Sequence, residues 1–234
     1  MNAVIAGVGI HPFGRFPVGY RELGEHAVRE CLKDAAVTPD EIDMTFVANV
    51  GAEMAKGHNV LDRVHHGGKP IINVEAACAS GGSALFLAAS MVSSGAARIV
   101  LCLGVEKAPR GFIARSGYEQ WQIESGLGVN PLYFAIQAAE LLEESDATLA
   151  DLADVAVKNH RHSVHNPNAM YRKEFTREQV LGSKPVCDPL TLLMLCAPNE
   201  GAVAAIVMDA DTARRRGVPD PIRLRGIGLV SRGP

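Results

Sequence analysis

The chain has 234 residues, of which 47% are hydrophobic and 21% charged, and its formal net charge is −3. This length suffices for one large domain, or for a core with an inserted lobe, and the composition is typical of a globular protein. The small net charge gives no reason to expect nucleic acid or a membrane surface as a partner.

The cysteines argue against a metal site and against a disulfide framework. There are five, an odd number, and no two have the spacing of a zinc knuckle. Free thiols are typical of a reducing cytoplasm. The N-terminus carries no charged segment before an apolar stretch, and the apolar runs are shorter than a membrane span. We therefore expect a cytoplasmic protein without a bound metal.

The first 50 residues predict a strand, a helix and a strand. Residues 3–10 are apolar enough for a strand buried on both faces. Gly7 and Gly9 invite comparison with a dinucleotide-binding loop, but the third glycine is missing and no helix follows, so we reject this interpretation. Residues 21–36 form an amphipathic pattern, residues 38–41 carry a capping box, and residues 44–50 predict the second strand.

Residues 51–70 are rich in glycine and carry His58, His65 and His66. A histidine cluster raises the question of a metal, but this spacing suits no common site and no carboxylate pair stands beside it. We predict a loop or an interface here. Residues 71–74 form the next strand.

Cys78 stands directly after this strand and before a predicted helix. The N-terminus of a helix stabilises negative charge, including a thiolate, and it can hold an oxyanion. Small residues follow, which would let a substrate approach the backbone. Cys78 is therefore a candidate nucleophile, whereas a buried structural cysteine is the alternative that local chemistry leaves open.

The helix after Cys78 is uncharged over residues 83–92. A helix that is apolar or small all round is buried between two layers, and this one is too short to span a membrane. Residues 98–105 then resemble a central parallel strand. This order of strands and helices predicts an α/β domain.

From residue 106 to 200 the pattern changes. We predict helices near 131–145 and 149–163, followed by about 30 irregular residues, a length that is usually functional. Residues 158–184 carry a formal charge of +4, from six basic and two acidic side chains. Either a solvated surface or an anion site for phosphates explains this charge. A strand over 201–208, a short helix over 211–216 and a last strand near 222–230 complete the chain.

Four segments, in this order, resemble the thiolases. Residues 74–84 resemble their nucleophile motif, most of all that of the lipid-transfer (sterol-carrier) type and of related bacterial and archaeal thiolases. Residues 104–107 resemble the turn after the third strand of a thiolase half, and 184–191 the end of the loop domain in lipid-transfer-type thiolases. Residues 199–205 resemble the segment that re-enters the sheet.

The resemblance implies the α/β/α N-terminal half of a thiolase, with a mixed, mainly parallel sheet. Residues 1–118 and 199–234 would form this domain, residues 119–198 would form an inserted loop domain that binds coenzyme A, and the C-terminal thiolase domain would be absent. Thiolases make or break a carbon–carbon bond in a 3-oxoacyl-CoA. Cys78 would attack the 3-keto carbon and become acylated, and coenzyme A would then take the acyl group.

The resemblance also implies binding residues in the loop domain. Coenzyme A enters as a substrate, and no covalently bound cofactor and no metal are implied. The basic segment would bind the nucleotide end of coenzyme A, with Arg172, Lys173 and Lys184 as candidates. Cys196 would line the channel for the pantetheine arm, although a packing role for it is an equal alternative.

The sequence departs from the family because the second half is missing. In thiolases that half supplies an activating histidine, an asparagine or histidine of the oxyanion hole, and a second cysteine that acts as acid and base. We therefore expect a homo-oligomer, a complementary thiolase half, or a zinc-ribbon/OB-fold partner.

Other functions remain open. The first is a retro-aldol carbon–carbon lyase of the lipid-transfer type, although such relatives tend to lack the nucleophilic cysteine. The second is a non-catalytic subunit that binds acyl-CoA or acts as a scaffold. A ketosynthase fits less well, since its nucleophile motif differs.

Overall fold

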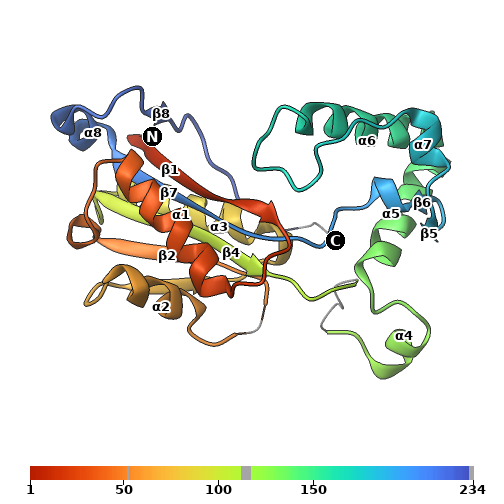
Figure 1. Cartoon of the computed structure of the whole chain (residues 1–234), viewed down its shortest axis with the longest axis horizontal. Coiled ribbons are helices and arrows are strands. Elements are labelled where there is room, and N and C mark those ends of the chain that lie inside the picture. Colours follow the sequence, from red (N-terminus) through yellow and green to blue (C-terminus); the bar gives the residue numbers. More distant parts are fainter. Residues whose placement is uncertain (52, 112–116, 232–234) are drawn as a thin grey trace. The chain divides into compact units, whose positions relative to one another are not determined.

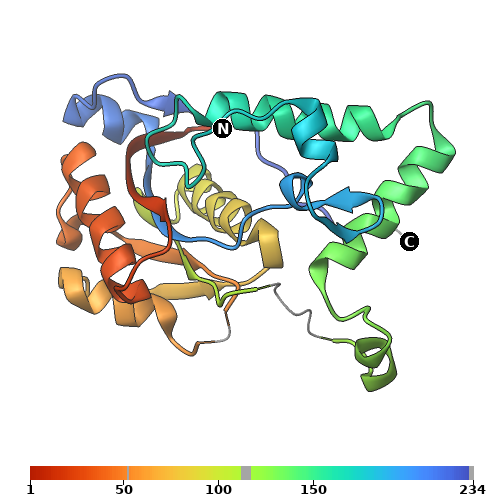
Figure 2. The same cartoon turned by 45° about the vertical axis from the view of Figure 1, so that its right-hand side comes forward.

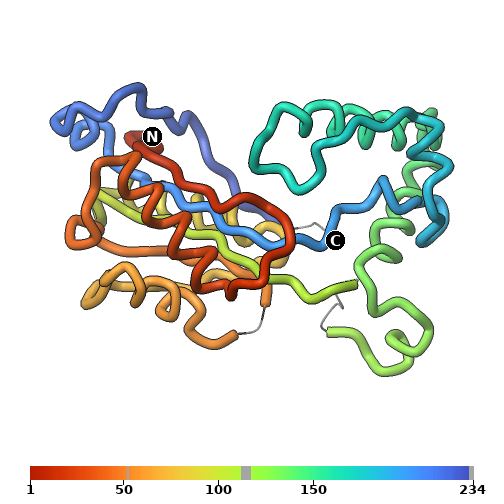
Figure 3. The backbone as a smooth tube through the Cα atoms, viewed as in Figure 1, coloured from red at the N-terminus to blue at the C-terminus, as the bar shows by residue number. Residues whose placement is uncertain are grey.

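The computed structural model describes residues 1–51, 53–111 and 117–231, and the chain divides into two compact units (Figure 1). Unit 1 comprises Met1–Lys107 and Glu200–Pro234, and unit 2 comprises Ala108–Asn199. Figure 3 follows the chain from unit 1 into unit 2 and back again. The insertion predicted over 119–198 falls inside unit 2, and its role as a coenzyme A-binding domain stays a prediction.

Unit 1 contains a six-stranded sheet in the order β3-β2-β4-β7-β1-β8. The strands are β1 (Ala3–Gly14), β2 (Met44–Ala48), β3 (Ile71–Val74), β4 (Ile99–Lys107), β7 (Glu200–Asp209) and β8 (Ile222–Arg223). β2 pairs in parallel with β3 and β4, whereas β7 is antiparallel to both β4 and β1, and β8 is antiparallel to β1. The predicted α/β class with a mixed sheet is confirmed. The strands β1 to β4 run in one direction, but β7 separates β1 from β4.

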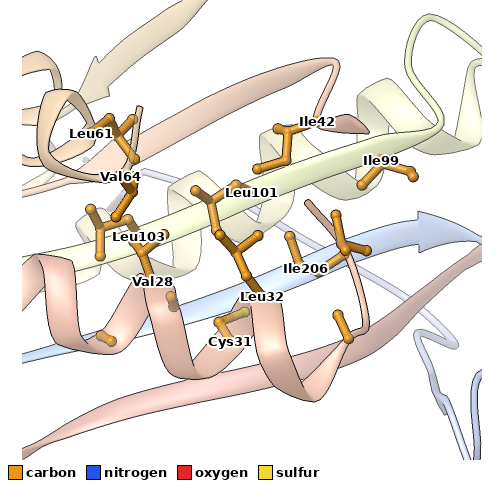
Figure 4. Close-up of a cluster of buried hydrophobic side chains, with 14 of the residues drawn as sticks. Val28, Cys31, Leu32, Ile42, Leu61, Val64, Ile99, Leu101, Leu103 and Ile206 are labelled. Carbon is orange, nitrogen blue, oxygen red and sulfur yellow. The ribbon is translucent and has the colours of Figure 1, made fainter. Parts of the chain in front are cut away.

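Helices cover both faces of this sheet (Figure 2). α1 (Tyr20–Asp34) and α2 (Lys56–Leu61) pack on one face, and α3 (Ser80–Ser93) packs on the other. The alternation of side chains along β4 builds two cores, because successive residues of a strand point to opposite faces. Leu101 and Leu103 join the core under α1, which Figure 4 shows, while Val100 and Cys102 join the core under α3.

The glycines of β1 serve the packing of α1. A Cβ atom on Gly9 would lie 2.1 Å from the carbonyl oxygen of Ala27 and 2.3 Å from the amide nitrogen of Cys31. A Cβ atom on Gly7 would lie 2.5 Å from the amide nitrogen of Ala35. These glycines therefore allow the backbones of helix and strand to approach closely, a use unrelated to nucleotide binding.

Three predicted elements of unit 1 differ from the structure. The capping box of Thr38 and Glu41 is present, but it opens only one 3-10 turn (Pro39–Glu41), because the fully buried Ile42 leads at once towards β2. The segment 51–70, predicted as a loop or an interface, contains α2, whose Val60 and Leu61 are fully buried. The last strand covers only β8, since after Leu224 the chain leaves the edge of β1.

Unit 2 is mainly helical. Its elements are α4 (Gln120–Glu124), α5 (Asn130–Glu144), α6 (Leu149–Ser163), α7 (Arg177–Leu181), β5 (Pro185–Cys187) and β6 (Leu190–Thr191). α5 and α6 agree with the predicted helices. The predicted irregular segment instead holds α7 and the β5–β6 hairpin, which are too short to produce a periodic pattern. A capping box begins α7, and Arg177 forms a bidentate ion pair with Asp154 of α6.

α3 is covered on only one side by the cores of unit 1. Ala84, Ala88 and Val92 are buried against the sheet. On the far side Gly82 is exposed, and Phe86 and Ser90 are half-buried. The expected burial of this uncharged helix between two layers is thus only partly met by the described residues of unit 1. In the part of the chain that the structure describes, no helix combines the length and the apolar character needed to cross a membrane.

Candidate active site around Cys78

Cys78 lies in a tight turn between β3 and α3. A 3-10 turn over Ala77–Ala79 leads into α3, which begins at Ser80. The side chain of Cys78 is exposed, so Cys78 is not a buried structural cysteine. Ala77, the residue before it, has a φ of 47°, in the left-handed region that costs free energy for any residue with a Cβ atom.

Two side chains hold this turn. The carboxylate of Glu75 accepts a hydrogen bond from the amide of Ala77 at 2.6 Å. The hydroxyl of Ser80 accepts one from the amide of Ala76 at 2.8 Å. Its oxygen also lies 2.7 Å from the carbonyl oxygen of Ala77 and 3.2 Å from that of Asn49, the two acceptors for its single proton.

The space beside Cys78 is open. Gly81 and Gly82, in the first turn of α3, are exposed, and a Cβ atom on either would meet nothing within 4 Å. The residue that precedes α3, Ala79, provides no side-chain cap. The amides of Ala79 and Ser80 are paired with the carbonyls of Ala76 and Ala77, so what this turn offers a negatively charged oxygen or sulfur is the positive end of the helix dipole.

A second polar group lies where β2 and β4 end. Glu106 accepts hydrogen bonds from the amides of Val50 at 2.7 Å and Gly51 at 2.9 Å, and from Lys56 Nζ at 2.8 Å. The Lys56 side chain is only 3% exposed. Burial disfavours the charge of Glu106, but the bonds from Lys56 and the two amides outweigh it and lower the pKa of this carboxyl.

Glu200 forms a third polar cluster at the start of β7. Its side chain, 7% exposed, pairs with Arg15 at 3.0 Å and Lys107 at 2.9 Å and accepts the amide of Phe16 at 3.0 Å. Burial raises its pKa, but these three donors prevail and bring the pKa of Glu200 to about 2. Lys107 and Glu200 flank unit 2 in the sequence, and they are joined both by this ion pair and by their pairing in the sheet.

The other four cysteines divide into two groups. Burial raises the pKa of the Cys31 and Cys102 thiols to about 12, and each donates to a backbone carbonyl, that of Gly7 and that of Ala84 respectively. These two are structural. Cys187 is half-buried, and Cys196 is exposed; both belong to unit 2.

The predicted binding residues all belong to unit 2, whereas Cys78 belongs to unit 1. Arg172 is exposed and donates to the carbonyl of Val164 at 3.3 Å. The ammonium of Lys173 stands 5.2 Å from the ring centre of Phe175. Lys184 is exposed after α7. Among the described residues, neither Lys173 nor Lys184 forms an ion pair.

No histidine completes the site within the described residues, and no side chain there forms a hydrogen bond with the thiol of Cys78. His66, which raised the question of a metal, is buried. Its Nε2 lies 3.1 Å from Thr45 Oγ1 and its Nδ1 lies 3.2 Å from the carbonyl oxygen of Pro39. Burial lowers the pKa of His66, so this side chain is a neutral part of the packing.

The sequence indicates Cys78 as a candidate and draws attention to the motif around Glu106, but it does not reveal the contacts of Ser80, Lys56 and Glu200. Ser80 lies within the nucleophile motif, yet a serine near the start of a helix has many ordinary uses. Lys56 gave no signal, since its partner is 50 residues away in the sequence. Only the fold brings such pairs together.

Comparison with known proteins places these features in a family. Residues 4–188 match the family model described as "Thiolase, N-terminal domain". The chain is 35% identical over 236 residues to benzoylsuccinyl-CoA thiolase subunit BbsB of Thauera aromatica, an alignment that covers 98% of the chain and 61% of that relative.

Solved structures agree with this match. The Ltp2-ChsH2(DUF35) aldolase superimposes with a TM-score of 0.79 and 26% identity, over 91% of this chain and 57% of that one. The Acat5 thiolase of Ascaris suum in complex with coenzyme A has the same fold, with a TM-score of 0.66 and 17% identity, over 93% of this chain and 68% of that one. The chain therefore spans about three fifths of the length of BbsB and of the Ltp2 aldolase.

Proposed function

Since the chain belongs to the thiolase family, we propose that it carries the nucleophile of an acyl-CoA C-acyltransferase and that Cys78 is this nucleophile. The observation that carries the proposal is the position of Cys78: an exposed thiol in a strained turn at the start of α3, beside two exposed glycines. An exposed thiol at the N-terminal end of a helix meets two requirements of a nucleophile, access and support for negative charge.

The reaction proceeds in two steps. The thiolate of Cys78 attacks the 3-keto carbon of a 3-oxoacyl-CoA, so that a carbon–sulfur bond forms and the bond between C2 and C3 breaks. The electron pair of that bond goes to C2, which takes a proton from an acid, and acetyl-CoA leaves. The thiol of coenzyme A then gives up its proton and attacks the acyl-cysteine, which restores the thiolate. The reverse sequence is a Claisen condensation.

The acid and base come from residues outside this chain in the proposed account. In support, no described side chain bonds to the Cys78 thiol, and the chain matches 61% of the length of BbsB. The far side of α3, with exposed Gly82 and half-buried Phe86, is available to a complementary thiolase half or to a second copy. A smaller partner protein is a further option, since BbsB is named a subunit and the Ltp2 structure is a complex with ChsH2.

Unit 2 binds the nucleotide end of coenzyme A in this proposal, through Arg172, Lys173 and Lys184, and Cys196 lines the path of the pantetheine arm. Exposed cations without ion-pair partners are free to bind phosphate. Changing both Arg172 and Lys173 to alanine should weaken coenzyme A esters about tenfold more than a pantetheine thioester that lacks the nucleotide. Arg214→Ala, which changes an exposed side chain of α8 (Ala210–Arg216), serves as the control. Equal losses of affinity for both esters would contradict the proposal that Arg172 and Lys173 bind the phosphates.

The nucleophile is tested by Cys78→Ser in the full-length enzyme. We expect turnover to fall by more than about 10³-fold while acyl-CoA still binds, because removing a covalent nucleophile removes the reaction path rather than the binding contacts. Cys187→Ser, in the β5 strand, is the matched control and should keep normal turnover. Normal turnover of Cys78→Ser would refute the assignment.

A retro-aldol lyase is the second candidate, favoured by the similarity to the Ltp2-ChsH2 aldolase. Such a reaction needs no acyl-cysteine. A lyase would keep its activity in Cys78→Ser and would release an aldehyde or ketone without consuming coenzyme A. A binding or scaffold subunit would show neither turnover nor acylation of Cys78.

We also propose a cytoplasmic location, which suits five free thiols.

A further inference from the structure

We propose that Ser80 is a positioning residue that directs the thiol of Cys78, a role that rests on the proposed nucleophile function. Ser80 touches no reacting atom in this account. It acts on Cys78 through the turn that precedes α3, and its hydroxyl is the point at which three segments of unit 1 meet.

The contacts of this hydroxyl reach beyond its own helix. Ser80 is 4% exposed. Its oxygen accepts the amide of Ala76 at 2.8 Å, and its proton is shared between the carbonyl oxygens of Ala77 at 2.7 Å and Asn49 at 3.2 Å. The hydroxyl therefore forms hydrogen bonds with two residues of the turn, Ala76 and Ala77, and with Asn49 in the segment that follows β2.

That segment is itself fixed. The residues after Asn49, Val50 and Gly51, both donate their amides to the carboxylate of Glu106, which also holds the buried Lys56. In addition, the amide of Asn49 donates to the carbonyl of Val74, the last residue of β3. Ser80 thus connects the turn to an anchored part of the backbone rather than to a loop that could follow it.

The turn needs such an anchor because Ala77 is held at a φ of 47°. A non-glycine residue stays in this region only when surrounding contacts determine it. Without the hydroxyl, the amide of Ala76 loses its partner and the carbonyl of Ala77 loses a donor, so the turn can relax towards an ordinary conformation. Since Cys78 is the next residue, any change at Ala77 turns its side chain away from the direction it has now.

Ser83 offers a matched control on the same helix. It is also 4% exposed, but its hydroxyl donates only to the carbonyl of Ala79, four residues earlier, at 3.1 Å. Ser83→Ala therefore removes a buried hydroxyl of α3 without touching Ala76, Ala77 or Asn49. If the loss of any buried hydroxyl lowers kcat, both variants show the loss, whereas misdirection of Cys78 lowers kcat only in the Ser80 variant.

The experiment compares kcat and KM of the full-length enzyme carrying Ser80→Ala or Ser83→Ala. We expect Ser80→Ala to lower kcat about 10- to 100-fold with KM for the acyl-CoA changed less than about threefold, because misdirection of a nucleophile acts on the reaction and not on binding. Ser83→Ala should keep kcat within about twofold. Equal kcat in both variants, equal losses in both, or a loss confined to KM would overturn the proposal.

A second pair of variants decides the matter if Ser80→Ala does not fold. Ser80→Thr and Ser80→Val have nearly the same shape, but only threonine keeps the hydroxyl. Ser80→Thr should keep at least about fivefold more kcat than Ser80→Val, and equal values would overturn the proposal. Cys78→Ser distinguishes failure of the nucleophile assignment from failure of the positioning role. If Cys78→Ser keeps its turnover, Cys78 is not the nucleophile. If Cys78→Ser loses turnover while Ser80→Ala keeps a normal kcat, only the positioning role of Ser80 is refuted.

Discussion

At the scale of single residues, the five cysteines show how the fold assigns different chemistry to one side chain. Cys31 and Cys102 lie in the two cores on opposite faces of the sheet and donate to backbone carbonyls. Cys78 is exposed in the 3-10 turn between β3 and α3. Exposure alone does not identify a nucleophile, because Cys196 is exposed as well. The distinction comes from the turn and from the helix that follows it.

Alkylation should therefore separate these thiols in the native protein. With a pKa of about 12, the Cys31 and Cys102 thiols are ionised in only about one molecule in 10⁴ at pH 8, and both are buried. We expect iodoacetamide to label Cys78 and Cys196 at least about 100-fold faster than this pair, as peptide mass spectrometry would measure. All five should react after unfolding. Early labelling of Cys31 or Cys102 in the folded protein would contradict the packing described here.

Glu200 makes a prediction about acid stability. Its pKa falls from 4.5 to about 2 on folding, so its contribution is present above pH 4.5 and is lost as the pH falls to about 2. Glu200→Gln should lower the free energy of unfolding by about 1–3 kcal/mol at pH 7. The difference from the wild type should shrink as the pH approaches 2. Urea unfolding at several pH values measures this, with exposed Glu30→Gln on α1 as the control; a difference independent of pH would be contrary to the account.

At the scale of elements, the close contact between β1 and α1 determines how the helix lies on the sheet. A Cβ atom on Gly9 would lie 2.1 Å from a backbone oxygen of α1, and backbone cannot yield as a flexible side chain does. The carboxylate of Asp34, in the last turn of α1, also accepts the amide of Val8 at 2.8 Å. The strand and the helix therefore form one tightly joined unit.

Gly9→Ala should accordingly destabilise the protein by about 3 kcal/mol or more, at the upper end of the cost of overpacking, because helix and strand must separate. Thermal or urea unfolding measures the loss. Gly67→Ala is the control, since a Cβ atom there meets nothing within 4 Å, and it should change stability by less than about 0.5–1 kcal/mol. Similar effects of both substitutions would show that α1 is not packed as closely as described.

Elements could be predicted from the sequence where burial follows a simple period. α1, α3, β4 and β7 were expected within a few residues, because their apolar side chains recur at helical spacing or form continuous runs. α2 was missed because its place depends on Lys56 pairing with Glu106 and on Gly57, whose amide donates to Asn73 Oδ1. β8 was overestimated, since strand propensity does not reveal whether a partner strand continues.

The candidate site was predictable only in part, and for a related reason. Cys78 could be found because its surroundings are local: a strand before it, small residues after it and a helix. The left-handed turn at Ala77 could not be foreseen, since alanine gives no signal for a positive φ. The roles of Glu106 and Glu200, and the bond of Ser80 to Asn49, depend on partners far away in the sequence, so they become visible only in the folded chain.

At the scale of the whole molecule, the chain is a thiolase-family α/β protein, and we propose that its two units divide the work. Unit 1 presents Cys78, and unit 2 carries the basic residues proposed to bind coenzyme A. The proposal that a complementary half supplies the acid and base explains why the uncharged α3 has a side that the cores of unit 1 leave uncovered.

The most direct test of the central claim is to trap the acyl-enzyme. The complete enzyme, including the part that supplies the acid and base, would be mixed with a 3-oxoacyl-CoA, quenched in acid and digested, and the mass of the peptide containing Cys78 would be measured by mass spectrometry. The account predicts that this peptide gains the mass of the acyl group, that added coenzyme A removes it, and that Cys196 and Cys187 stay unmodified. Turnover of the substrate without any acyl group on Cys78 would contradict the account.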